Sequence, residues 1–267
     1  MDPLQIGITV TSVMMLMIFF GMRVAFASAL AGTVGLVWIL SSKLGLEKAL
    51  SAGLGMAGTI PHSKAVTYAL SILPMFILIG FLAFHAGLTK SLFEAAKRGL
   101  GRLPGGLAVA TVFATAGFAA VSGASTATAA VFARVAIPEM LRDGYSRRLA
   151  AGVVAAGGTL ATLIPPSAIL VIYAIIVEES VGQLLLAGFL PGIVSALIYG
   201  LIIVSIVSFK PEMGPKTRVF SFKEKIVSLP GTVPIFSVII IIFGSMYFGW
   251  ATPTEAGALG AFVVFVI

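Results

Sequence analysis

Long apolar runs constrain this chain more than any other feature. Five of them have spanning or near-spanning length, at about 4–21, 24–40, 67–86, 181–208 and 231–250. A helix needs roughly 20 apolar residues to cross the hydrocarbon core of a bilayer. The composition of the whole chain agrees with these runs, because 59% of the residues are hydrophobic and only 10% are charged. Soluble domains are much more polar than this. The runs predict an all-α integral membrane protein, a multi-span helical bundle.

The spanning pattern is broken twice between Gly105 and Pro166. Two runs, at about 106–121 and 125–138, are each short for a crossing and meet at the small polar stretch from Ser122 to Thr126. The next run is interrupted by Gly157-Gly158-Thr159 and closed by Pro165-Pro166. Irregular backbone at membrane depth is tolerated only where protein covers it or where it lines a wet cavity. We predict a re-entrant helical hairpin followed by a broken helix, an arrangement typical of transport sites.

The distribution of basic residues supports the re-entrant reading of the hairpin. If the chain enters and leaves the membrane on one side, both basic flanks of the hairpin are cytoplasmic, as the positive-inside rule requires. Only Lys43, Lys48 and Lys64 then lie outside. A full crossing at 106–138 would place the later basic loops outside. The residues assigned to the cytoplasm are Arg23, Lys90, Lys97, Arg98, Arg102, Arg134, Arg142, Arg147, Arg148, Lys210, Lys216, Arg218, Lys223 and Lys225.

Three connecting segments have recognisable character. Residues 41–66 are glycine-rich and mildly amphipathic, and we expect them to lie along the membrane interface, with His62 in a solvated loop. Residues 88–103 alternate apolar and basic positions at helical spacing, which predicts an interfacial amphipathic helix. Residues 209–230 form a polar linker that we expect on the cytoplasmic side.

The ends of the apolar pattern carry two further signals. Thr252, Pro253 and Glu255 fit a helix start, with Thr252 as N-cap and Glu255 as capping-box partner, so we interpret Glu255 as structural. The first run lacks a preceding basic region and reads as a retained membrane anchor rather than a signal peptide.

These observations divide the chain into four functional segments. Residues 1–104 are scaffold-type spans with the interfacial segment and the amphipathic helix. Residues 105–178 carry the transport-type hairpin and broken helix, and 179–230 a spanning helix with the cytoplasmic linker. Residues 231–267 hold a further span and the capped helix start, which the family resemblance given below identifies as the start of a second repeat.

The two breaks have the chemistry of an ion and carboxylate site. A helix that ends inside the membrane offers free carbonyl oxygens, which suit a hard cation such as Na⁺, and a helix that begins there offers amides and a positive dipole end. Hydroxyl groups add further oxygen atoms at the first break, and no organic cofactor is expected. The predicted sodium or substrate residues are Ser122, Gly123, Ala124, Ser125, Thr126, Gly157, Gly158, Thr159, Pro165 and Pro166, with Na⁺ assigned to Ser122, Ser125, Gly158 and Thr159.

Other readings of the same residues stay open. Small residues also mediate close helix packing, and Thr111, Thr115 and Thr128 fit hydroxyls bonded back to their own helix. Gly123-Ala124-Ser125 resembles the Gly-x-Ser of rhomboid-type intramembrane proteases, but no histidine follows Ser125 to serve as a base. A passive channel has the same composition as a carrier. The net charge of +7 is dispersed between apolar runs, which argues against nucleic-acid binding.

The chain as a whole resembles the DctM-like large membrane subunit of TRAP transporters, the tripartite ATP-independent periplasmic carriers. The matching stretches are 73–106, 121–130 (VSGASTATAA), 137–174, 187–194 and 251–261 (ATPTEAGALGA). The resemblance implies sodium-driven import of organic anions, of the C4-dicarboxylate, sialic acid or 2-oxo acid class, by an elevator movement. It also implies a small membrane subunit, a periplasmic substrate-binding protein as partners, and the inner membrane of a bacterial or archaeal cell.

Two departures from the family pattern limit the resemblance. Many members have a serine where this chain has Ala124, so a side-chain ligand is missing there and backbone carbonyls would have to serve. The family is built from two inverted repeats, each with its own hairpin and helix break, whereas this chain reaches Ile267 shortly after the second repeat begins. We therefore expect a fragment that holds one half of a two-hairpin site and does not transport alone.

Overall fold

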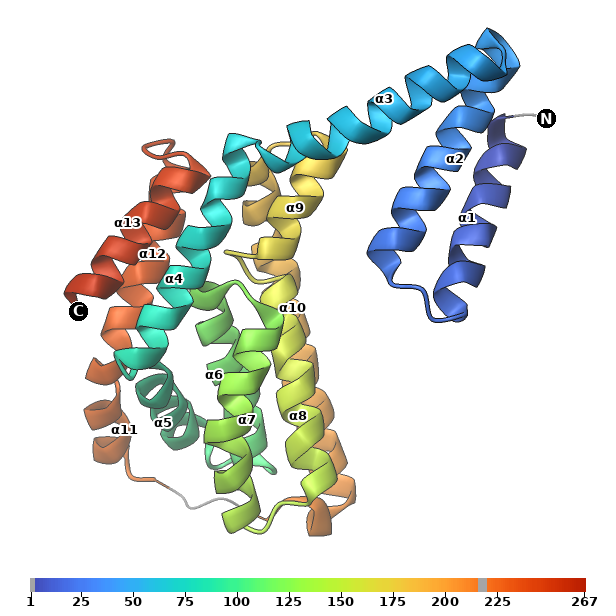
Figure 1. The fold of residues 1–267 in the computed structure, drawn as a ribbon. Helices are drawn as coiled ribbons and strands as arrows, with labels where there is room; N and C mark the ends of the chain where they lie inside the picture. Colours follow the sequence, from blue (N-terminus) through green and yellow to red (C-terminus); the bar gives the residue numbers. More distant parts are fainter. Residues whose placement is uncertain (1–2, 216–219) are drawn as a thin grey trace. The chain divides into compact units, whose positions relative to one another are not determined.

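A computed structural model describes residues 3–215 and 220–267 of the chain. Every regular element in these ranges is a helix (Figure 1). The chain divides into two compact units, one ending at Thr67 and the other beginning at Tyr68. The four functional segments predicted above follow other boundaries and stay predictions.

The first unit contains three helices. These are α1 (Pro3–Phe19), α2 (Val24–Leu44) and α3 (Leu46–Ala65), in which α2 packs against both of the others. Close packing of α1 on α2 depends on Gly35, whose Cβ position would lie 3.0 Å from a methyl of Val10. Residues 41–66 thus belong to two helices separated at Gly45, and their location at an interface stays a prediction. His62 is exposed in the last turn of α3, so its placement in a loop was wrong.

The second unit holds the predicted hairpin, the helix break and the remaining spans. Its α-helices are α4 (Ile72–His85), α5 (Leu88–Leu100), α6 (Gly106–Ser122), α7 (Ser125–Arg142), α8 (Arg147–Thr159), α9 (Ala168–Val177), α10 (Val181–Phe209), α11 (Phe222–Ser228), α12 (Val233–Tyr247) and α13 (Pro253–Val266). Short 3₁₀ turns are η1 (Tyr68–Ser71), η2 (Leu160–Thr162), η3 (Pro211–Met213) and η4 (Pro230–Thr232).

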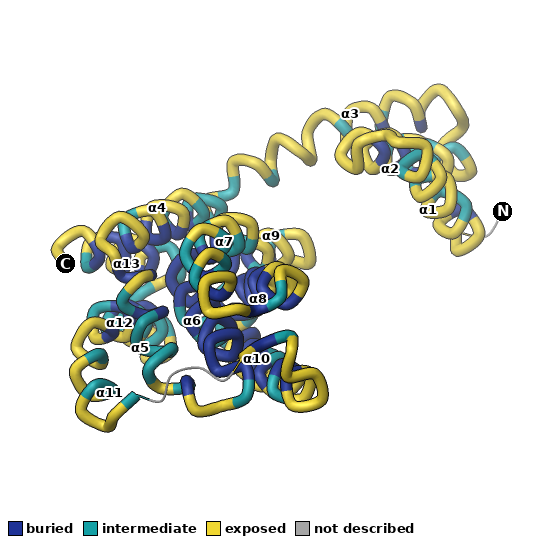
Figure 2. The backbone as a smooth tube through the Cα atoms, turned by 90° about the horizontal axis from the view of Figure 1, so that it is seen from below, coloured by how far each residue is buried: buried dark blue, intermediate teal, exposed yellow. Residues whose placement is uncertain are grey.

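Helix α6 is the centre of this unit. It packs against α4, α5, α7, α8, α10 and α12, and it is buried along almost its whole length (Figure 2). Its sequence, GLAVATVFATAGFAAVS, explains this position, because small side chains on all faces let several helices approach closely. The core around it includes Phe76, Phe118 and Phe132, all essentially inaccessible to solvent.

Four described segments are long and apolar enough to cross a membrane. They are Val24–Leu44, Tyr68–His85, Val181–Phe209 and Phe222–Tyr247, which confirms the predicted helical membrane protein at this level. The first predicted run is the 17-residue helix α1, which counts among the shorter apolar helices together with α6, α9 and α13.

Two features predicted from the sequence, an amphipathic helix and a capping box, are confirmed. Helix α5 is amphipathic, and Leu88, Leu92 and Phe93 line its buried face. The capping box of α13 forms as predicted, with Thr252 and Glu255 exchanging hydrogen bonds. The polar linker at 209–230 contains α11 with its own capping box, and its location on the cytoplasmic side stays a prediction. Lys216 and Arg218, assigned to the cytoplasm above, lie outside the described residues.

Candidate functional site

Helices α6 and α7 form the predicted helical hairpin. Only Gly123 and Ala124 separate them, Gly123 in the left-handed region at φ 63° and Ala124 extended as the N-cap of α7. The two helices pack side by side (Figure 1). At the far end, the Leu107 N–H near the start of α6 donates to the Tyr145 hydroxyl just after α7, at 3.3 Å. The chain therefore enters and leaves the hairpin at the same end.

The tip of the hairpin is tightly enclosed. Ser122 is 3% exposed, and its hydroxyl pairs with the hydroxyl of Thr128 at 2.7 Å. Gly80 of α4 lies against it, since a Cβ on Gly80 would sit 2.9 Å from the Ser122 Cα. Thr128 was thus misread as a hydroxyl bonded back to its own helix. Thr111 and Thr115 do bond back, to the carbonyls of Leu107 and Thr111.

The second break begins at the end of α8 and extends to the start of α9. Gly157, Gly158 and Thr159 are the last residues of α8, and the carbonyls of both glycines accept backbone bonds at the helix end. Both glycines stay helical, but the α-helix ends at Thr159, which confirms that the helix is interrupted at this triplet. After η2 the chain is irregular over residues 163–167, where the Pro165–Pro166 peptide is cis. Fully buried Ser167 then begins α9 by accepting the Leu170 N–H and donating to the Thr162 carbonyl.

Gly157 and Gly158 serve close packing of α8 on the hairpin. A Cβ at Gly157 would lie 3.1 Å from the side chain of Thr115 on α6. A Cβ at Gly158 would lie 2.8 Å from the Cβ of Ala129 on α7 and 3.4 Å from the Ser125 carbonyl oxygen. Neither position leaves room for a side chain without movement of its neighbour. The packing role considered above for small residues therefore holds at these two positions.

The hairpin tip and the second break meet directly. The Ala168 N–H, in the first turn of α9, donates to the Gly123 carbonyl oxygen at 3.1 Å. The Pro166 carbonyl oxygen lies only 2.5 Å from where a Cβ on Gly123 would be. Only glycine fits this place, because the conformation is left-handed and the neighbour is backbone. The site predicted from two separate breaks is thus brought together at Gly123.

The other predicted residues divide into two groups. Ser122, Gly158, Pro165 and Pro166 are buried beside this junction, and Ala124 and Ser125 are partly exposed at it. Thr126 and Thr159 are exposed. The Thr159 hydroxyl donates to the Ala156 carbonyl and pairs with the Tyr199 hydroxyl of α10 at 3.3 Å, so its described bonds lead away from the tip.

The described residues that meet at the junction offer oxygen atoms, and those named below have no ionisable side chain. Carbonyl oxygens of Gly123, Ser125 and Pro166 and the hydroxyls of Ser122 and Thr128 lie within it. The first turn of α7 begins at Ala124 without a side-chain cap. Such a turn presents backbone amides to an anion. Among the described residues, no group of three or more His, Cys, Asp or Glu could hold a metal ion. Carbonyls and hydroxyls suit a hard cation with a carboxylate beside it.

Sequence reasoning missed Gly80, which sits against Ser122. A signal was present, because a lone glycine within an apolar helix often marks a close approach of another backbone.

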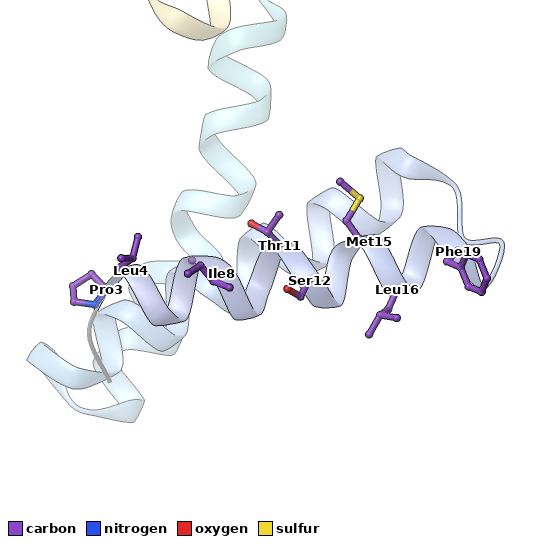
Figure 3. A pocket seen from close by; sticks show the side chains of 9 residues that line it. Pro3, Leu4, Ile8, Thr11, Ser12, Met15, Leu16 and Phe19 are labelled. Atoms are coloured by element: carbon purple, nitrogen blue, oxygen red, sulfur yellow. The ribbon is translucent and has the colours of Figure 1, made fainter.

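A separate hollow lies along α1 (Figure 3). Its lining consists of α1 residues alone, among them Leu4, Ile8, Met15 and Phe19. It includes none of the predicted site residues.

Comparison with known proteins assigns the family. Residues 11–267 match the family described as Tripartite ATP-independent periplasmic transporter, DctM component. The chain belongs to this family. It is 39% identical over 194 residues to the C4-dicarboxylate TRAP transporter large permease protein DctM of Pseudomonas aeruginosa, covering 73% of this chain and 45% of that protein. It is 31% identical over 252 residues to the sialic acid TRAP transporter large permease protein SiaM of Vibrio cholerae, covering 92% of this chain and 55% of that protein.

A third relative widens the range of substrates named in the family. The 2,3-diketo-L-gulonate TRAP transporter large permease protein YiaN of Escherichia coli is 29% identical over 245 residues, covering 92% of this chain and 55% of that protein. The chain spans about half the length of these relatives. These relatives are named as transport permeases and not as enzymes, and the described part of this chain has four helical segments long and apolar enough to cross a membrane.

Proposed function

We propose that this DctM chain forms one half of the ion and substrate site in a sodium-coupled importer of organic anions. The substrate belongs to the C4-dicarboxylate, sialic acid or 2-oxo acid class. A periplasmic binding protein delivers it, and a small membrane subunit completes the carrier in the bacterial inner membrane. The observation that carries the proposal is the hydrogen bond from the Ala168 N–H to the Gly123 carbonyl, which unites the two breaks.

The proposed sodium ligands come from both sides of this junction. Carbonyl oxygens at the end of α6 and in the segment 163–167 provide the hard oxygen donors that sodium prefers. The hydroxyls of Ser122 and Ser125 are the side-chain candidates, because Ala124 has none. A substrate carboxylate would bind at the uncapped first turn of α7.

The elevator movement is proposed for the hairpin and the broken helix together. The Gly123–Ala168 bond and the close contacts of Gly157 and Gly158 join α6, α7, α8 and α9 at one end. We propose that the hairpin re-enters from the cytoplasm, because Arg102, Arg142 and Arg147 lie at the ends linked by the Leu107–Tyr145 bond.

The experiment is uptake into proteoliposomes by a complete subunit carrying this sequence, with both partners present. Labelled C4-dicarboxylate, sialic acid and 2-oxo acid are supplied with and without an inward sodium gradient. We expect uptake of one class, and we expect Ser125→Ala to weaken its dependence on sodium. Ser237→Ala on α12 is the matched control, since its hydroxyl only bonds back to the Val233 carbonyl.

Two outcomes would contradict the proposal. Uptake that persists at full rate without a sodium gradient would indicate a passive channel. A sodium dependence that Ser125→Ala leaves equal to that of Ser237→Ala would remove the hairpin tip from the sodium site.

A further inference from the structure

A recessed apolar groove runs between α8 and α10, away from the hairpin tip. Its volume is about 300 Å³. A second hollow of about 610 Å³ continues it along α10, and the two share Ile202, Ile206 and Met213. The lining of the first is Arg148, Leu149, Gly152, Val153, Ala156, Tyr199, Ile202, Ile203, Ile206 and Met213; the second adds Ile198, Leu201, Ser205, Phe209 and Lys210.

A glycine opens the first groove. Gly152 is exposed, and a Cβ built on it would meet no heavy atom within 4 Å. This is the opposite of Gly157 and Gly158 on the same helix, which are filled by the hairpin arms. On the other side of the first groove, Ile202 is 49% exposed, and along the second hollow Ile198 and Leu201 are 48% and 67% exposed. The groove is therefore unfilled by the chain that surrounds it.

The two grooves share a cationic end. Arg148 lies in the first turn of α8 and Lys210 follows the last residue of α10, and both are exposed. The Ser146 N–H donates to the Met213 carbonyl at 3.0 Å, which fixes the start of α8 beside the end of α10. Among the described residues that line the two hollows, none is acidic. Glu212 is exposed nearby but does not line either one.

The length of the grooves matches one leaflet of a bilayer. Lys210 is separated from Ile198 by twelve helical steps, about 18 Å at the α-helical rise. Half of the hydrocarbon core is about 15 Å thick. The grooves thus begin at positive charge, continue through apolar side chains for the depth of one leaflet, and end near Tyr199.

We propose that these two grooves bind an anionic diacyl phospholipid. Its phosphate would lie between Arg148 and Lys210, with one acyl chain in each groove. Charge complementarity selects an anionic over a zwitterionic headgroup, because two cations face it and no acidic side chain lines the site. The site would fasten α8 to α10 through the lipid on the face opposite the hairpin contacts of Gly157 and Gly158.

The test is native mass spectrometry of the purified full chain in detergent. Phosphatidylglycerol and phosphatidylcholine with identical acyl chains are added at equal concentration, and the retained adducts are compared. We expect preferential retention of phosphatidylglycerol. Arg148→Gln should weaken its binding about fivefold, the effect of one basic residue near a membrane surface. Gly152→Leu, which fills the groove, should reduce retention of both lipids.

Two neighbours on α8 provide matched controls. Arg147 and Ala155 are exposed but line neither groove, so Arg147→Gln and Ala155→Leu should bind lipid like the native chain. Thermal unfolding of each variant in detergent checks that it is folded. If Gly152→Leu does not fold, the comparison of Arg148→Gln with the native chain still tests the proposal. Equal retention of the two lipids by the native chain, or equal binding by Arg148→Gln and Arg147→Gln, overturns the proposal. So does loss of the phosphatidylglycerol adduct when the small membrane subunit is added, because the groove would then hold protein.

Discussion

Two triplets of small residues in this DctM chain look alike in sequence but fold differently. Ser122-Gly123-Ala124 ends one helix and begins the next, whereas Gly157-Gly158-Thr159 completes the last turn of α8. Both lie in apolar runs and both include a hydroxyl residue, Ser122 and Thr159. Gly123 takes a left-handed conformation beside a backbone carbonyl, while Gly157 and Gly158 stay helical and face side chains. Small residues thus mark close approach in both cases, and only the conformation separates a break from a packed helix.

The largest effect is expected at the tip, from Gly123→Ala. The new Cβ would sit 2.5 Å from the Pro166 carbonyl oxygen in a left-handed residue. Strain and overlap together should lower the free energy of unfolding by about 3 kcal/mol or more. Reversible unfolding in mixed micelles, followed by circular dichroism, measures it. Gly152→Ala is the control, because its Cβ meets open space and should stabilise α8 by up to about 1 kcal/mol. Equal stability of the two variants would show that Gly123 does not lie against the Pro166 carbonyl in a left-handed conformation.

A smaller loss is expected from Gly158→Ala, about 1–2 kcal/mol of unfolding free energy, through overpacking against α7. The neighbour here is a side chain, since the added Cβ would lie 2.8 Å from the Cβ of Ala129. Adding Ala129→Gly should therefore restore part of the stability in the same unfolding assay. No truncation of a side chain can restore Gly123→Ala in this way. If the double variant is no more stable than Gly158→Ala, then Gly158 does not pack against the side chain of Ala129, and the difference proposed between the two triplets is wrong.

The hydrogen bond between the Ser122 and Thr128 hydroxyls at the hairpin tip can be tested by removing one of the two hydroxyls. Ser122→Ala leaves the buried Thr128 hydroxyl without its 2.7 Å partner, and about 1 kcal/mol of stability should be lost. Ser237→Ala, which removes a hydroxyl bonded within its own helix, should change stability by less than about 0.5 kcal/mol. Chemical unfolding of the two variants under identical micelle conditions compares them. A Ser122→Ala variant as stable as Ser237→Ala would mean that the pair does not fasten the tip.

The smallest effect is expected at the end of the second triplet. Thr159→Val keeps the shape of an exposed side chain and removes its 3.3 Å contact with Tyr199. The unfolding free energy should change by less than about 0.5 kcal/mol. A loss as large as that of Ser122→Ala would show that Thr159 belongs to the same polar cluster as the tip.

The sequence predicted the hairpin well and the second break less well, for a physical reason. A short helix, a glycine, an extended residue and a new helix are all local features, so Ser122 to Ser125 could be read directly. Gly157 and Gly158 have no local reason to stay helical. They do so because Thr115 and Ala129 pack against them, and those contacts come from other helices. The bond between Ala168 and Gly123 joins residues 45 apart in the chain, and no pattern in a single sequence announces such a pairing.

The same long-range bond changes how the short helices end. In an isolated helix the last carbonyls and the first amides have no partner within the helix. Here a carbonyl just beyond α6 receives a first-turn amide of α9, so the negative end of one helix dipole meets the positive end of another. Each end partly neutralises its counterpart without solvent. Helices α6 and α9 are each too short to cross a membrane separately. The hydrogen bond between their ends pairs a carbonyl with an amide, so an apolar environment can tolerate the junction.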